Sequence, residues 1–529
     1  MMSFTGGMLR KSLLVASAAA MTAFAQPAFS EGKALNVVVA SVDGEDMDPI
    51  MFKSAGQTTY YPLVFDTLIT KDPSTGELMP GLAESWSLDS DGKSWIFKLR
   101  KGVKFQDGSD FTAEDVKFTI ERYMGKFGAV AATGSQRIAG MVTSIDIIDD
   151  YTIAVRSEKG APTLPFDLAA YDPGVALGYI VPSDYVQKVG EEAFNKAPIG
   201  TGPFKFVSQD IGRQMTFATN KDYWKGAASY DTLNLKIVPE LAARMAQLRS
   251  GEADIVSGIV GPAIPQVESD SSLKVVPAEK GHIIYLIVGG LTSDTPLSKL
   301  EVRKAINMAI DRQAIVDHLL YGHGAPAYLF GFPFSFGWPS DADKYKVAYD
   351  PEAAKKMLAD AGYPNGFDLT LYAATEGRDF AQAIAQYLGA IGVNVKLEVR
   401  EISQALAEAR SEEGKKQARM VLVFGATGSG ARADIGGLLY TYFALGQPMN
   451  QPHGDEELSK WVVTQAQTAD PDKRKQMISD ILRRAAETDA NLPLYYADSL
   501  FAVGQSVSEW HPVPGVGYPS NLGGVKLAN

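Results

Sequence analysis

Cysteine is absent from all 529 residues of this chain. Without a thiol, the chain has no cysteine nucleophile, no thiolate metal site and no disulfide framework. A bacterial lipoprotein needs a cysteine at its cleavage site, so the sequence also predicts that the protein carries no lipid anchor. The absence of thiols is compatible with an oxidising compartment outside the cytoplasm.

Histidine is scarce as well, with five in the chain. They occupy positions 282, 318, 323, 453 and 511, and only His318 and His323 are near each other in the sequence. A separation of five residues does not match the spacing of two metal ligands on one helical face. The sequence therefore predicts no metal site, no cofactor and no catalytic residue.

Long apolar runs are missing beyond the first 30 residues. Arg10 and Lys11 precede the apolar stretch 12–25, which is shorter than the ~20 residues that a membrane-spanning helix needs. Small residues suited to signal peptidase follow, with cleavage after Ala25 or Ser30. Residues 1–30 are predicted to be a signal peptide of a soluble protein exported to the periplasm; an uncleaved anchor is the alternative.

Positive charge is in deficit, because 50 Lys and Arg stand against 62 Asp and Glu and give a formal net charge of −12. Removal of residues 1–30 would also remove Arg10 and Lys11, which takes −12 to −14. A surface of this sign argues against nucleic acid and anionic lipid as partners. A mature chain of this length can form two or more lobes.

Local patterns predict an α/β fold. Short segments bounded by Gly, Pro, Asn or Asp predict strands in the first half of the chain, with clear alternation at 94–99, and apolar spacing predicts a few helices there. The predicted strands are 35–40, 94–99, 152–155, 204–207, 214–219, 233–238 and 253–256, and the predicted helices are 58–70, one from Thr112 with Asp115 in a capping box, and 239–251.

The pattern changes near residue 285, where longer helices begin to alternate with strands. The predicted helices are 350–362, which has Asp350 as its cap and Pro351 at its first position, 379–392 and 435–445; the predicted strands are 393–399 and 420–424. This alternation is typical of a mostly parallel sheet covered by helices. We expect the main lobe boundary near 285.

Ten segments, in order from about residue 35 to 510, resemble the peptide/nickel-type family of extracytoplasmic solute-binding proteins (family 5). They are VFDTL (64–68), LAESW (82–86), FKLRKGVKF (97–105), DG (107–108), TAEDV (112–116), IGTGPF (199–204), DYW (222–224), SGEAD (250–254), VRKA with AIDR (302–312), and 350–363. We expect most of these segments to stabilise the fold and not to contact the ligand. Residues 200–203, for example, are expected to form a tight turn that leads into a strand.

The resemblance implies a two-lobed periplasmic-binding-protein (Venus flytrap) fold with mixed sheets, of the large class with an extra subdomain in the first lobe. Residues 34–66, 186–285 and 499–529 would form the lobe I core, 67–185 the extra subdomain and 286–498 lobe II. The lobes would close over a small-molecule or short-peptide ligand and be recognised by the permease of an ABC importer with cytoplasmic ATPases. The protein would be a monomer and not an enzyme.

One departure from the family pattern concerns the ligand. Peptide-binding relatives typically place a Trp and, three residues later, an Asp after the strand that corresponds to 420–424, and this Asp holds the ligand's α-ammonium group. The matching stretch here, 425–430, is GATGSG and contains neither. A buried ammonium without a carboxylate is costly, which puts a plain peptide in doubt. Asp434 is the candidate substitute.

The glycine-rich segment 428–433 follows a strand and precedes a helix, as a dinucleotide-binding loop does. However, the strand is not the first of its unit, and no acidic residue ends a following strand about 20 residues on. Nucleotide binding is therefore disfavoured, and a surface loop or a loop that lines the ligand site remain. The second alternative adds Gly425, Thr427 and Ser429 to the candidate site.

Arg378 and Arg432 could bind a ligand carboxylate, because guanidinium suits a bidentate carboxylate. In dipeptide-type relatives an Arg near Arg378 is expected in this role; a surface pair with Glu376 or Asp379 is the alternative. Lys53 and Ser54 follow the Asp48-Pro49 turn, where relatives often present ligand contacts. His282 and Tyr285 lie near the first crossing between the lobes.

The candidate ligand-binding residues are thus Lys53, Ser54, His282, Tyr285, Arg378, Gly425, Thr427, Ser429, Arg432 and Asp434. The alternating aromatic residues 330–338 could stack on a ligand, although packing in a core or on a lobe surface is favoured. The sequence favours a peptide-like or amino-acid-conjugate ligand. An oligosaccharide or another polar solute is the alternative within transport, and a secreted hydrolase is the alternative outside it.

Overall fold

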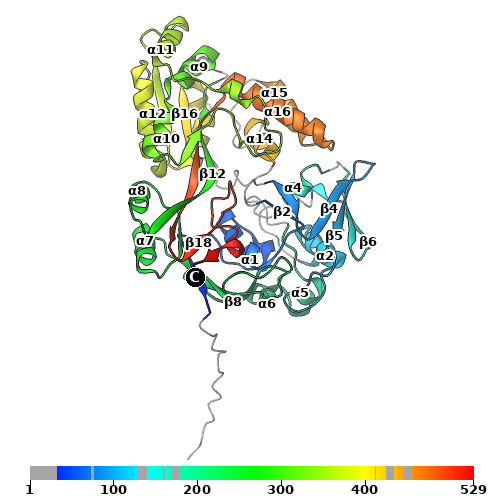
Figure 1. Ribbon diagram of the computed structural model, residues 1–529. Coiled ribbons are helices and arrows are strands. Elements are labelled where there is room, and N and C mark those ends of the chain that lie inside the picture. The colour runs from blue at the N-terminus through cyan, green and yellow to red at the C-terminus, as the bar shows by residue number, and fades with distance from the viewer. Residues whose placement is uncertain are drawn as a thin grey trace, which may run out of the picture.

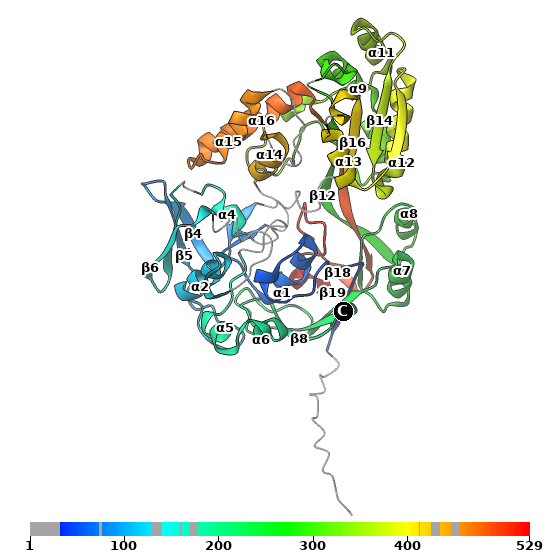
Figure 2. The ribbon, with the colours of Figure 1, turned by 180° about the vertical axis from the view of Figure 1, so that it is seen from behind.

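The computed structural model describes residues 32–72, 77–128, 140–158, 161–169, 178–291, 293–411, 413–424, 434–445 and 455–528. The predicted signal peptide, residues 1–30, lies outside this range. The chain forms two lobes joined along a pair of long strands, as Figures 1 and 2 show from opposite sides. The expected two-lobed α/β fold is confirmed. No helix among the described residues is long and apolar enough to cross a membrane.

Lobe I contains one end of a sheet whose described strands number eleven. Its strands there are β1 (Ala34–Val39), β8 (Phe204–Asp210), β9 (Gln214–Thr219), β10 (Thr232–Ile237) and β11 (Ile255–Ser257), in the order β11-β1-β10-β9-β8. β1 runs parallel to both β10 and β11. Leu35, Val37 and Val38 of β1 are fully buried, because helices α7 (Leu241–Ser250) and α8 (Ala263–Glu268) cover one face of the sheet and a second apolar cluster covers the other.

The part of lobe I that the resemblance identifies as an extra subdomain has a hydrophobic core of its own. Its strands are β2 (Ile69–Lys71), β3 (Leu78–Pro80), β4 (Ala83–Leu88), β5 (Ser94–Leu99), β6 (Ser144–Asp149) and β7 (Thr152–Arg156), and β4-β5-β7-β6 form one antiparallel sheet. The helices here and at its border are α1 (Tyr61–Val64), α2 (Ala113–Tyr123), α4 (Leu164–Asp167), α5 (Ser183–Val189) and α6 (Glu191–Lys196). Thr112 and Asp115 form the predicted capping box of α2.

The helix predicted over 58–70 is wrong. A short 3-10 turn (Ala55–Thr59) and α1 replace its first half, and the second half is extended. The backbone amides of Gly81 and Leu82 donate to the carbonyls of Leu68 and Thr67, at 3.1 and 2.9 Å, so pairing with a distant segment wins over local helical spacing.

Lobe II contains the other end of the same sheet, in the order β15-β14-β16-β12-β17. The strands not yet named are β12 (Leu273–Val288), β13 (Gly324–Pro326), β14 (Asp368–Ala373), β15 (Asn394–Val399), β16 (Arg419–Phe424), β17 (Asn491–Gly504), β18 (Val507–Glu509) and β19 (Lys526–Leu527). β14 is parallel to β15 and β16, whereas β12 is antiparallel to β16 and β17, so this part of the sheet is mixed.

Helices cover both faces of the lobe II sheet. α9 (Leu300–Ala309), α10 (Arg312–Leu319), α11 (Pro351–Asp360) and α12 (Arg378–Ala390) pack on one face, and α13 (Ile402–Arg410), α14 (Gly436–Phe443), α15 (Glu456–Gln465) and α16 (Pro471–Thr488) pack on the other. Asp350 caps α11 as predicted, since its side chain accepts a hydrogen bond from the Ala353 amide at 2.9 Å.

Several of the family-like segments meet at Asp66, which is 9% exposed. Its carboxylate accepts hydrogen bonds from the Tyr223 hydroxyl (2.8 Å), the Trp224 indole N–H (2.9 Å) and the Thr201 hydroxyl (3.0 Å). A Cβ on Gly200 would lie 2.1 Å from the carbonyl oxygen of Val64, so the turn packs directly on backbone. These segments fix the architecture of lobe I, in agreement with their structural interpretation.

β12 and β17 pass from one lobe into the other and pair along most of their length. β12 continues through residue 285. The lobe boundary that the sequence predicts near 285 therefore lies within a strand and not in a loop. The register shifts between Ala278 and His282. Within this interval Lys280 adopts a φ of 54°, and its amide donates to the Asp498 carboxylate at 2.8 Å. We call residues 278–283 and 496–499 the hinge.

The first prediction concerns Gly281 in the hinge. A Cβ there would lie 2.2 Å from the Ser499 hydroxyl oxygen and 3.1 Å from the Ser499 amide nitrogen. Gly281→Ala should therefore force the two hinge strands apart and lower the free energy of unfolding by about 1–3 kcal/mol, measured by urea denaturation. Gly389→Ala in α12 is the control, since nothing lies within 4 Å of a Cβ there, and a gain of about 0.5–1 kcal/mol is expected. Equal stability of the two variants would contradict the tight hinge.

Candidate functional site

The strand register places the ends of the parallel strands of both lobes beside the hinge. In lobe I, Ser257 at the end of β11 lies opposite Phe501 of β17, next to the hinge residues 496–499. In lobe II, Phe424 at the end of β16 lies opposite Ile284 of β12, next to hinge residue 283. Ligands of open α/β sheets bind at the carboxyl ends of strands, so the segments that follow these ends form the candidate site.

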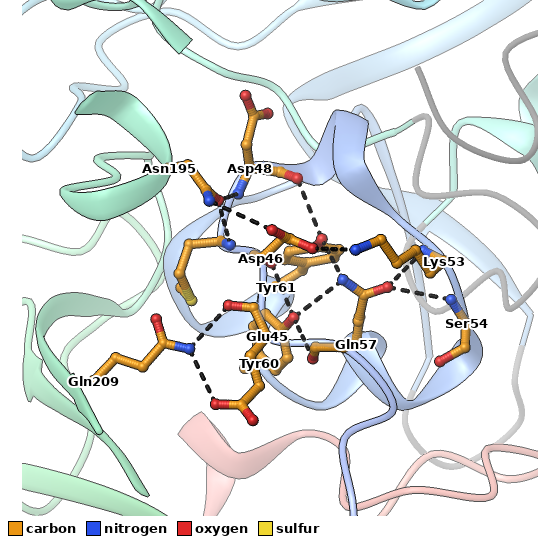
Figure 3. Close-up of polar contacts among 12 residues, drawn as sticks. Glu45, Asp46, Asp48, Lys53, Ser54, Gln57, Tyr60, Tyr61, Asn195 and Gln209 are labelled. Carbon is orange, nitrogen blue, oxygen red and sulfur yellow. Dashed lines mark hydrogen bonds and ion pairs between the residues drawn. The ribbon is translucent and has the colours of Figure 1, made fainter. Parts of the chain in front are cut away.

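The lobe I segment of the site follows β1 and is held by a buried amide (Figure 3). The Gln57 side chain is fully buried, and its carbonyl oxygen accepts from the Lys53 and Ser54 amides at 2.6 and 3.2 Å. Its NH2 group donates to the Tyr60 and Tyr61 hydroxyls at 3.2 and 2.9 Å. These four hydrogen bonds hold the backbone at Lys53 in one conformation. A ligand that contacts this segment would therefore not have to pay for ordering it.

The hydroxyl groups of Tyr60 and Tyr61 also bind backbone carbonyls of residues 44–48. The Tyr60 hydroxyl lies 2.9 Å from the carbonyl oxygens of both Gly44 and Asp46, and the Tyr61 hydroxyl lies 3.2 Å from that of Asp48. Burial raises the pKa of both phenols well above their ordinary value. They remain neutral donors over the whole physiological pH range.

Lys53 and Ser54, two of the predicted site residues, lie on this scaffold. The Lys53 ammonium lies 2.7 Å from the Asp46 carboxylate, and its side chain is 54% exposed. Its charge is therefore partly compensated and still accessible to solvent. Ser54 is half-buried at the start of the 3-10 turn, where its amide is bound by Gln57.

A buried ion pair lies directly behind the same segment. The Arg122 guanidinium from α2 binds both oxygens of Asp48, at 2.6 and 3.2 Å, and both side chains are at most 3% exposed. The Asn195 side-chain oxygen accepts from the amides of Met47 and Asp48 at 2.7 and 2.8 Å. The subdomain helix α2 thus anchors the lobe I side of the site.

His282 and Tyr285, both on β12, differ in their accessibility. His282 is half-buried in the hinge, where its Nε2 lies 3.2 Å from the Ser499 hydroxyl of β17. Tyr285 is 1% exposed, belongs to a core of lobe II and hydrogen-bonds through its hydroxyl to that of Tyr442. The expectation that Tyr285 contacts a ligand is corrected, because its side chain points into the sheet-covering core.

Arg378 begins α12, directly after β14 and a 3-10 turn at Thr375–Gly377. Its side chain is exposed, and it makes no ion pair or hydrogen bond with any residue that the structure describes. The surface pair with Glu376 or Asp379 that the sequence allowed is therefore not formed. A free guanidinium at the end of a parallel strand is available to an anionic group.

Asp434 is buried and already paired. Its two carboxylate oxygens bind the guanidinium of Arg474 from α16, one of them at 2.9 Å, and the side chains are 5% and 1% exposed. The same carboxylate accepts from the Gly436 amide at 2.7 Å. The expectation that Asp434 replaces the missing ligand-binding aspartate is corrected, because its charge is neutralised inside lobe II.

Four of the predicted site residues, Gly425, Thr427, Ser429 and Arg432, lie outside the described residues. Among the residues that are described, no group of three or more His, Asp or Glu side chains could hold a metal ion.

Sequence reasoning missed the polar scaffold around Gln57. Its signal was present, because Ser54 and Gln57 have the Ser-x-x-Gln spacing of a capping box. The Asp48–Arg122 and Asp434–Arg474 pairs carried no local signal, since their partners are 74 and 40 residues apart in the sequence.

Comparison with known proteins agrees with this architecture. A sequence profile of "Bacterial extracellular solute-binding proteins, family 5 Middle" matches residues 77–443. Di/tripeptide-binding protein 1 of Pseudomonas aeruginosa is 30% identical over 390 residues, which are 68% of this chain and 70% of that protein. Heme-binding protein A of Haemophilus influenzae is 29% identical over 323 residues, 58% of this chain and 57% of that protein. The solved structure of HbpA2 from Haemophilus parasuis superposes with a TM-score of 0.79 at 24% identity and covers 94% of this chain and 100% of that chain.

The second prediction tests the assignment of Asp434 to the lobe II interior. Asp434→Asn would leave the Arg474 charge buried without a counter-charge, and should lower the free energy of unfolding of lobe II by about 3–5 kcal/mol in urea denaturation. Asp341→Asn is the matched control, because Asp341 pairs with Arg483 where both side chains remain 25–29% exposed, and a loss below about 1 kcal/mol is expected. A small effect of Asp434→Asn would mean that this carboxylate is free for another role.

Proposed function

Because this chain belongs to the bacterial extracellular solute-binding proteins of family 5, we propose that it captures a peptide-like or amino-acid-conjugate ligand that carries a carboxylate. The chain is a substrate-binding protein of an ABC importer, and its place of action is outside the cytoplasm. The periplasm is the proposed compartment, and a transmembrane permease with cytoplasmic ATPases is the proposed partner. The protein is proposed to act as a monomer and to leave its ligand chemically unchanged.

The observation that carries the proposal for the ligand is the free guanidinium of Arg378. It stands at the end of β14 and at the first turn of α12, whose unpaired amides favour negative charge. Three other charged groups considered for the site are compensated within the protein: Asp48 by Arg122, Asp434 by Arg474 and Lys53 in part by Asp46. A carboxylate that reaches Arg378 would gain a charge-assisted, bidentate interaction without displacing a protein partner.

The proposal for the ligand also draws on relatives. The protein from Pseudomonas aeruginosa is named for di- and tripeptides and the one from Haemophilus influenzae for heme, and all of these compounds contain carboxylates. The missing Trp and Asp after β16 argue for a ligand whose ammonium group is absent, modified or held elsewhere. An oligosaccharide or another polar solute is the alternative cargo.

We also propose the division of the chain. The lobe I core is assigned to 34–66, 186–285 and 499–529, the extra subdomain to 67–185 and lobe II to 286–498. The hydrophobic clusters support this division to within a few residues, because one lies almost wholly within 68–180 and two lie within 283–496, so that residues 283–285 at the proposed boundary pack with lobe II.

The test of the proposed function is mass spectrometry of small molecules released when the purified protein is denatured. A carboxylate-bearing peptide or amino-acid conjugate is expected. Incubation of the recovered compound with native protein should return it unchanged, whereas turnover would favour the alternative of a secreted hydrolase. A neutral sugar in the released fraction would instead favour the oligosaccharide alternative.

The third prediction is that Arg378→Ala weakens binding of the recovered carboxylate by about 2 kcal/mol or more, close to thirtyfold in Kd, in isothermal titration calorimetry. The reason is the loss of a bidentate partner for the anionic group. Arg213→Ala serves as control, since Arg213 is 80% exposed and pairs with Asp210 at the far edge of the sheet. An unchanged Kd for Arg378→Ala would remove this residue from the site.

A further inference from the structure

Two aromatic side chains from different lobes meet on the side of the molecule away from the hinge. The Phe166 ring of α4, in the subdomain, and the Phe336 ring of lobe II have centroids 5.5 Å apart and planes inclined by 53°. Both side chains are half-buried. In both views the subdomain rises opposite α7 and α8, and α4 lies at its top, below α14 and α16 (Figures 1 and 2).

Lobe II holds Phe336 firmly. Its backbone forms a β-bridge with Asp434, and the Arg474 guanidinium carbon lies 5.6 Å from the ring centroid. The next residue, Gly337, has its carbonyl bound by the Ser479 hydroxyl at 2.6 Å. The ring is therefore presented from a fixed support whose charges, Asp434 and Arg474, neutralise each other.

The subdomain holds Phe166 in the same way. Leu164 and Leu168, on either side of it, are fully buried in the subdomain core. The carbonyl of Ala161 accepts from the Trp95 indole at 3.0 Å, and the Thr163 hydroxyl donates to Asp167 at 2.9 Å. The helix turn is fixed, and Phe166 is the side chain that it directs toward lobe II.

The surroundings of the ring pair are apolar and incompletely packed. A cavity of about 320 Å³ adjoins the pair; its lining includes Trp86, Trp95 and Pro165 from the subdomain and Pro471 from lobe II. Protein interiors are close-packed, so voids lined by rings from two bodies leave apolar surface that further approach of the bodies would bury. The contact can therefore tighten as the lobes close.

We propose that Phe166 and Phe336 form a latch that holds the lobes together opposite the hinge, and that the extra subdomain thereby raises affinity for any ligand without touching it. A ligand that needs both lobes binds the closed state, so its apparent affinity scales with the fraction of molecules already closed. The latch can open at low cost, because it is apolar and leaves no unpaired charge when the rings separate. It depends on the two-lobed fold and not on the identity of the ligand.

The latch is first tested by cross-linking, for which the absence of cysteine is an advantage. In the double variant Phe166→Cys/Phe336→Cys, a short bifunctional thiol reagent should join the two positions within one chain, visible by mass spectrometry of digested protein. The pair Phe166→Cys/Tyr349→Cys is the control, since Tyr349 packs on Tyr387 within lobe II. Equal cross-linking of the two pairs would overturn the proposed contact.

The energetic role is tested with Phe166→Ala, Phe336→Ala and their combination. Each should increase the radius of gyration of ligand-free protein in small-angle X-ray scattering and weaken binding of N-acetyl-Gly-Leu, a dipeptide without a free α-ammonium group, about two- to tenfold in calorimetry. Because both substitutions break one contact, the double variant should lose little more than either single one. Phe336→Tyr keeps the ring and should behave as the unsubstituted protein.

Tyr349→Ala, which removes an aromatic side chain 45% exposed on lobe II, is the matched control and should change neither quantity. Unfolding midpoints of all variants show whether each remains folded. If N-acetyl-Gly-Leu fails to bind even the unsubstituted protein, the proposal of a peptide-like ligand is weakened, while scattering still decides the latch. Scattering curves of the alanine variants that superpose on that of the unsubstituted protein would overturn the latch.

Discussion

The continuity of one sheet through both lobes is the constraint on which the rest of the structure depends. β12 and β17 carry a ladder of backbone hydrogen bonds from lobe I into lobe II, with an irregular register at the hinge. Backbone groups in such a ladder need their partners, so the lobes cannot separate there and can move only by bending the pair. The same register brings the ends of β11 and β16 to the hinge and so determines where a ligand can meet both lobes.

The charged groups of the two lobes differ in how far they are compensated. Asp48–Arg122 in lobe I and Asp434–Arg474 in lobe II are bidentate, buried pairs that fix the backbone of their segments. Buried pairs of this kind contribute little net stability, but the loss of one partner is costly, so they hold one arrangement. Arg378, by contrast, makes no ion pair with any residue that the structure describes, and Lys53 is compensated only in part. The proposed ligand carboxylate would therefore find these two cations more accessible than the two buried arginines.

Much of the local structure could be predicted from the sequence, because local chemistry decides it. The apolar strand β1, the capping box at Thr112 and the Asp350-Pro351 start of α11 are all found where expected. The helix over 58–70 was wrong because distant strand pairing decides that segment. Asp434 and Tyr285 were chosen for their place in the chain, but partners 40 and 157 residues away withdraw both from solvent. The spacing of neighbouring residues in the sequence does not reveal partners so far away.

Different interactions join the lobes at the hinge and on the opposite side of the molecule. At the hinge, backbone hydrogen bonds are reinforced by polar contacts such as His323 of lobe II with Glu268 of lobe I, whose atoms lie 2.8 Å apart. Breaking buried hydrogen bonds exposes groups that must each find new partners, so this side suits a permanent joint. Opposite the hinge, Phe166 and Phe336 offer apolar surface, whose association is non-directional and tolerates repeated separation. A receptor that must open for every cargo needs its reversible contact to be of this second kind, which gives the extra subdomain a physical reason to reach across to lobe II.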